Sequence, residues 1–79
     1  MADKFLDCRG MNCPMPIVAI TRTVKSMSNG QRLEVHATDL AFRMDLEAWV
    51  RRTGHRLESF EEGEVQRAVV EISSPDPTA

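Results

Sequence analysis

Two segments of the chain, residues 14–27 and 39–54, each carry a single apolar stripe at helical spacing, which sets the tightest limit on the fold. A helix with one apolar face is stable only when that face packs against another layer. Between the two segments, residues 32–38 alternate strictly between apolar and polar side chains, as a half-buried strand does. The pattern therefore predicts helices packed on a sheet. The two stripes consist of Ile17, Ile20, Val24 and Met27, and of Phe42, Leu46, Trp49, Val50 and Thr53.

Residues typical of helix ends and turns complete this prediction. Asp39 is a suitable N-cap for the second helix, Gly54 a C-terminal stop, and Glu62-Gly63 a hairpin turn. We expect the order βαβαββ, with both helices on one face of a four-stranded mixed sheet. This is an α+β fold, a two-layer α/β sandwich. The predicted strands are Lys4–Cys8, Arg32–Thr38, Arg56–Glu61 and Val65–Ser73.

Length and charge exclude several classes of protein. Seventy-nine residues suffice for one domain, which we place at 1–73, with a disordered Pro- and Ser-containing tail at 74–79. Ten basic and twelve acidic residues give a net charge of -2, whereas proteins that grip nucleic acid are normally basic. No apolar run is long enough to span a membrane, and no signal-peptide region follows the N-terminus. We expect a cytoplasmic monomer.

The segment with chemical content is Cys13-Pro14-Met15-Pro16, at the start of the first helix. Two prolines stiffen the first turn and hold Cys13 at the cap position. Free N–H groups and the helix dipole favour a thiolate there, so we expect the pKa of Cys13 to be lowered. Arg9 would add positive charge if its loop turned inward.

No general base is expected beside this cysteine. His36 and His55 have no evident reason to approach Cys13, and a chain this short has little room for a substrate pocket. An exposed thiol without base or pocket is suited to carrying a group covalently. A persulfide is the natural cargo, because its transfer needs only attack by one cysteine sulfur on another.

The run Asp7-Cys8-Arg9-Gly10-Met11-Asn12-Cys13-Pro14-Met15-Pro16 resembles the signature of the TusA-like sulfur-carrier family (SirA/YedF/YeeD-type). The resemblance implies a βαβαββ sandwich, a sulfurtransferase activity without cofactor or metal, and a protein donor and acceptor of sulfur. The donor would be a desulfurase or a rhodanese. It also implies that Cys13 becomes the persulfide, that Pro14 and Pro16 are the box prolines, and that Gly10 is the loop glycine. Met15 stands where studied members often have Glu.

Alternative interpretations accompany several residues. Cys8 is either a part-buried strand residue or a second thiol, so a redox switch or regulatory module based on Cys8 and Cys13 is the runner-up function. A zinc site is disfavoured, because the cysteines and histidines lack the usual paired spacing. Met15 is read as an apolar rim for partners, and Arg22 and Lys25 as a solvated face that could steer an acidic partner.

Overall fold

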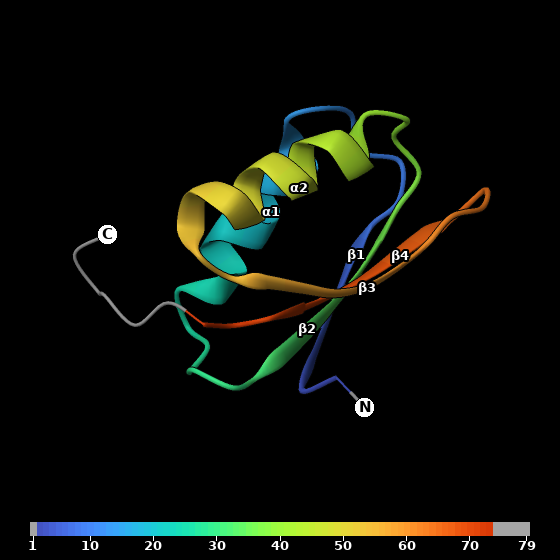
Figure 1. The fold of residues 1–79 in the computed structure, drawn as a ribbon. Coiled ribbons are helices and arrows are strands. Elements are labelled where there is room, and N and C mark those ends of the chain that lie inside the picture. Colours follow the sequence, from blue (N-terminus) through green and yellow to red (C-terminus); the bar gives the residue numbers. More distant parts are fainter. Residues whose placement is uncertain (1, 74–79) are drawn as a thin grey trace.

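The computed structural model describes residues 2–73, and Figure 1 shows their arrangement. The predicted tail at 74–79 lies outside the described residues. The order βαβαββ is confirmed. The elements are β1 (Lys4–Cys8), α1 (Met15–Val24), β2 (Arg32–Ala37), α2 (Phe42–Thr53), β3 (Arg56–Glu61) and β4 (Gln66–Glu71).

The four strands form one mixed sheet in the order β1-β2-β4-β3. β1 pairs in parallel with β2, so α1 is the crossover between them, while β4 pairs antiparallel with both β2 and β3. Both helices lie on the same face of the sheet, as Figure 1 shows. The predicted two-layer α+β sandwich is thereby confirmed.

The core lies between the helices and the covered face of the sheet. The alternation predicted for β2 is confirmed, because Leu33, Val35 and Ala37 are fully buried while Glu34 and His36 remain partly exposed. Apolar burial of this kind is the main source of stability in a small domain. β1, the helices and β4 complete the cluster with Cys8, Ile20, Phe42, Leu46, Trp49, Ala68 and Val70.

Two details of α1 differ from the expectation. Pro14, not Cys13, takes the N-cap position, and the helix ends at Val24 rather than near Met27. Residues 25–27 leave the helix in a tighter turn, in which the N–H of Met27 donates to the carbonyl of Val24. Met27 still packs against the core.

The start of α2 also differs. The expectation that Asp39 caps this helix is wrong, because Ala41 takes the N-cap position without any side-chain cap bond. The Asp39 carboxylate accepts instead from the N–H of Ala41, in the turn that precedes the helix. The C-terminal stop is confirmed, since Gly54 adopts a left-handed conformation with φ of 88° and its N–H donates to the carbonyl of Val50.

The last hairpin is shorter than expected. β3 and β4 pair antiparallel, and β4 covers Gln66–Glu71 rather than Val65–Ser73. Ile72 nevertheless stays buried, and its N–H donates to the carbonyl of Gln31. Neither helix within residues 2–73 has the length and apolar character needed to cross a membrane.

Candidate functional site around Cys13

The loop after β1 is held close to the end of β2. Gly10 has φ of 83°, a left-handed conformation that only glycine adopts without strain, and its N–H donates to Thr38 Oγ1 at 2.9 Å. The N–H of Met11 turns back to the carbonyl of Cys8 at 3.2 Å. These hydrogen bonds hold the β1–α1 loop beside the end of β2. As a result, Cys13 lies next to the turn that leads into α2.

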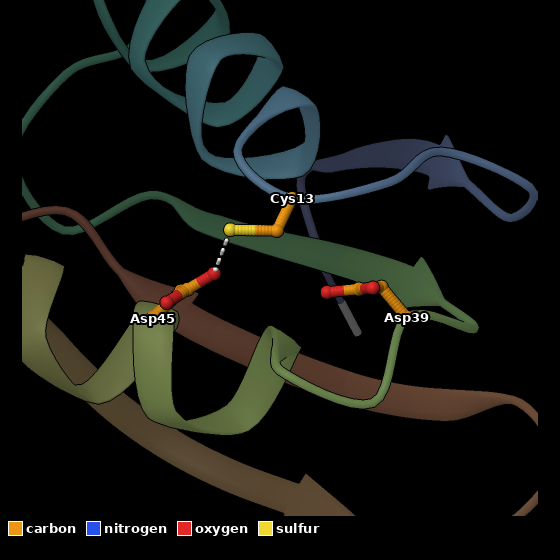
Figure 2. Close-up of side chains that lie close together, drawn as sticks. All are labelled: Cys13, Asp39 and Asp45. Carbon is orange, nitrogen blue, oxygen red and sulfur yellow. Dashed lines mark hydrogen bonds between the residues drawn. The ribbon is translucent and has the colours of Figure 1, made fainter.

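The Cys13 thiol meets a carboxylate from the second helix. Its Sγ donates a hydrogen bond to Asp45 Oδ2 at 2.8 Å, across 32 positions of sequence, as Figure 2 shows. Asp39 reaches the same place, and one ligand atom from each of these three residues lies within 4.8 Å of the other two. Three such atoms could hold a cation, but the hydrogen bond already accounts for the thiol and one carboxylate. The expectation that no general base lies beside Cys13 is therefore wrong, because the Asp45 carboxylate accepts the hydrogen bond of the thiol.

The first turn of α1 offers the sulfur no free amide. Pro14 and Pro16 carry no N–H, Met15 donates to the carbonyl of Asn12, and Ile17 and Val18 both donate to the carbonyl of Pro14. The prolines that stiffen this turn thus also remove the donors that would stabilise a thiolate.

The prediction of a lowered thiol pKa is consequently wrong. The hydrogen bond to Asp45 raises the pKa of Cys13, and partial loss of solvent and the negative charges of Asp45 and Asp39 act in the same direction. The side chain is exposed, so the resting site is an accessible thiol rather than a thiolate.

Arg9 is engaged elsewhere. Its guanidinium makes two hydrogen bonds to the carboxylate of Asp7, at 2.9 and 3.0 Å. The side-chain and backbone hydrogen bonds from Arg9 lower the pKa of Asp7 to about 2. The positive charge that Arg9 would have added beside Cys13 if its loop turned inward instead neutralises Asp7, at the end of β1.

A small open pocket of about 200 Å³ adjoins the thiol. Ligand pockets usually measure about 300–1,000 Å³, so this space is smaller than a usual ligand site but leaves room for sulfur added to Cys13. Its lining residues are Cys13, Pro14, Ile17, Asp45, Ala48 and Arg52.

Three of these residues, all on α2, were not expected at the thiol. Asp45, Ala48 and Arg52 recur at spacings of three and four, which places them on one face of α2. That spacing was readable in the sequence, but it does not tell which element the face will meet. Arg52 is a basic residue in the last turn of α2.

Cys8 has a different environment. It is 0% exposed within the core cluster, and burial, followed by the charge of Asp7, raises the pKa of its thiol. Both cysteines are free. A disulfide between Cys8 and Cys13 would require the buried sulfur to leave the core, and no observation favours the redox-switch alternative.

The remaining candidates lie on the surface. Met15 is 51% exposed at the first position of α1, and Arg22 and Lys25 are exposed at the far end of that helix. Met11, in contrast, packs against the core. A docking role for the three exposed residues stays a prediction.

The two histidines lie elsewhere, as expected. His36 pairs with Glu34 and meets the ring of Phe5. His55 lies against Trp49 and accepts from the N–H of Ser73.

Comparison with known proteins agrees with this geometry. The family model described as "Sulfurtransferase TusA" matches residues 4–72, from the start of β1 to just beyond β4. The chain is 46% identical over 65 residues to YrkI of Bacillus subtilis, named as a candidate sulfur carrier protein, with 81% of this chain and 87% of YrkI covered. It is 47% identical over 62 residues to the sulfur carrier protein TusA of Allochromatium vinosum, with 77% and 82% covered.

A further relative is longer. YrkF of Bacillus subtilis, also named as a candidate sulfur carrier protein, is 48% identical over 67 residues. The match covers 84% of this chain but 36% of YrkF, so the chain spans about a third of that relative. With the family match from residue 4 to residue 72 and the exposed thiol at the start of α1, the chain belongs to the TusA family of sulfur carriers.

Proposed function

We propose that this protein accepts sulfane sulfur as a persulfide on Cys13 and passes it to a partner protein. The observation that carries the proposal is the exposed Cys13 thiol at the start of α1, beside an open pocket that leaves room for added sulfur. The family to which the chain belongs is described as a sulfurtransferase family, which supports this proposal. The site is open on the surface, so a partner's cysteine can reach the sulfur directly.

The loading step is an exchange between two cysteines. The Cys13 sulfur attacks the outer sulfur of a donor persulfide and forms a new S–S bond, while the donor's own S–S bond breaks. The electron pair of that bond goes to the donor's inner sulfur, which leaves as a thiolate and takes up the proton released by Cys13. One thiol and one persulfide are consumed and one of each is formed, so no external oxidant or reductant is needed.

Discharge is the same exchange with the roles reversed. An acceptor's thiolate attacks the outer sulfur on Cys13 and restores the thiol. The protein is then a carrier that returns to its starting state only when a second protein takes the sulfur. We propose a desulfurase or a rhodanese as the donor, and a single domain over residues 1–73 that acts as a monomer, without direct contact with nucleic acid.

Intact-mass spectrometry after incubation with a sulfur donor tests this function. Wild type is expected to gain about 32 Da, one sulfur atom, in a step that requires a reactive thiolate. Cys13→Ser is expected to fold, since the side chain is exposed, and to gain nothing. Equal gain by Cys13→Ser would refute the assignment, because the sulfur would then reside elsewhere.

A further inference from the structure

We propose that Asp45, assisted by Asp39, destabilises the persulfide on Cys13 relative to the free thiol. The loaded protein then transfers its sulfur to an acceptor more readily. The inference rests on the proposed function. It concerns the balance between the empty and the loaded forms of the site, and it follows from the contacts of the Cys13 sulfur.

The empty form is stabilised by a specific contact. The thiol proton of Cys13 points at Asp45 Oδ2, with 2.8 Å between the two heavy atoms. A hydrogen bond to a charged acceptor is stronger than one between neutral groups. Loss of the proton would leave the sulfur and the carboxylate both negative at that distance, which is why Asp45 raises the pKa of the thiol.

The loaded form loses this contact. A persulfide is a stronger acid than its parent thiol, so near neutral pH its outer sulfur is largely an anion. The inner sulfur then has no proton to donate to Asp45 Oδ2. The added sulfur must lie in surroundings that two carboxylates make negative, since ligand atoms of Asp39, Asp45 and Cys13 all lie within 4.8 Å of one another.

The charges around the sulfur come from three parts of the fold. α2 provides Asp45 and, further along the same face, Arg52, which lines the pocket. The turn before α2 provides Asp39. The β1–α1 loop provides Arg9, whose charge is occupied by Asp7, and the first turn of α1 contains no acidic residue. Among residues 2–73, the charged side chains at this site are therefore two carboxylates, one of which touches the sulfur, and the guanidinium of Arg52.

Both effects act in one direction. The hydrogen bond lowers the free energy of the empty thiol, and the repulsion raises that of the loaded anion. The equilibrium constant for loading is therefore smaller than it would be without the carboxylates, and discharge to an acceptor is correspondingly favoured.

Equilibrium with a small persulfide tests the proposal. Glutathione persulfide and glutathione exchange sulfur with Cys13, and intact mass gives the ratio of loaded to empty protein at neutral pH. Asp45→Asn keeps the shape of the side chain but removes its charge. We expect this variant to raise the ratio by about fivefold, as the loss of one charge-assisted hydrogen bond on an exposed sulfur implies.

Two further variants calibrate the effect. Asp39→Asn is expected to raise the ratio less, because its charge is the smallest of the influences on Cys13. Glu58→Gln makes the same change of net charge at the opposite end of the sheet, where Glu58 pairs with Arg32. Its ratio is expected to equal that of wild type.

The pH profile of Cys13 alkylation by iodoacetamide gives a second readout that does not depend on sulfur loading. Only the thiolate reacts, and Asp45 raises the pKa of the thiol. The alkylation rate of wild type therefore rises at a higher pH than that of an ordinary cysteine. In Asp45→Asn the whole profile is expected to move to lower pH. Circular dichroism of the same variant shows whether the fold is retained.

The outcomes separate the two proposals. An unchanged or decreased loading ratio in folded Asp45→Asn would overturn the inference while leaving Cys13 as the sulfur carrier. An alkylation profile that does not move would overturn it as well. Failure of wild type to load at all would instead refute the proposed function itself.

Discussion

At the scale of single residues, the chemistry of Cys13 depends on which groups its sulfur meets. A helix start normally offers free N–H groups, but here two prolines lack them and the neighbouring amides are bonded within the turn. The sulfur instead donates a hydrogen bond to the carboxylate of Asp45 on α2. The sulfur is thus uncovered and protonated, which suits a carrier that should react with partners rather than with every electrophile in solution.

Cys8 provides a residue-scale prediction. Because its sulfur is 0% exposed and burial raises its pKa, a disulfide reagent such as Ellman's at neutral pH should label only Cys13 in the folded protein. Both cysteines should react after unfolding in guanidinium. Folded Cys13→Ser is the matched control and should not react. Rapid labelling of Cys8 in the folded chain would contradict its placement in the core.

The limits of sequence reasoning are clearest at this scale. Cys13 could be identified because cysteine, prolines and glycine lie within one short run of sequence. Its partner could not, because Asp45 is 32 positions away and meets the thiol only through tertiary packing. The partner of Arg9 is a different case, because Asp7 lies only two positions away and forms an ion pair with its guanidinium.

At the scale of secondary structure elements, the length of each helix depends on local contacts at its ends as well as on its apolar stripe. Periodicity predicted both helices, but it placed the end of α1 three residues too far and assigned the cap of α2 to Asp39. Helix ends are decided by a few local hydrogen bonds of similar strength, so a pattern of apolar residues locates them poorly. Gly54 was predictable because a left-handed residue is best provided by glycine.

Gly54 therefore gives the element-scale prediction. Gly54→Ala should destabilise the protein by about 1–2 kcal/mol, the cost of a left-handed conformation for a residue with a Cβ. A Cβ at this position would make only ordinary contact with the carbonyl oxygen of Ser73, at 3.8 Å, so the cost is one of backbone conformation. Urea denaturation measures it.

Gly63→Ala is the matched control, since Gly63 lies in the β3–β4 connection without the positive φ of Gly54. Its expected effect is within about 0.5 kcal/mol, as for most surface substitutions. Equal effects of the two substitutions would show that the conformation of Gly54 does not matter.

At the scale of the whole molecule, the architecture was predictable and the site only partly so. Strand alternation and one apolar stripe on each helix leave few arrangements other than helices on one face of a sheet. The strand order β1-β2-β4-β3 and the rotation of α2 about its axis are set by side-chain packing across the core. That rotation is what brings Asp45 and Arg52 to the Cys13 pocket.

The whole account depends on one thiol that both receives and releases sulfur. The most direct test follows radioactive sulfane sulfur from a donor persulfide protein, through this chain, to a separate acceptor thiol. With wild type, the label should appear first on Cys13, as a form that a thiol reductant removes, and then on the acceptor. With Cys13→Ser, neither stage should occur above the rate of direct transfer from donor to acceptor. Transfer through Cys13→Ser at the rate of wild type would contradict the account.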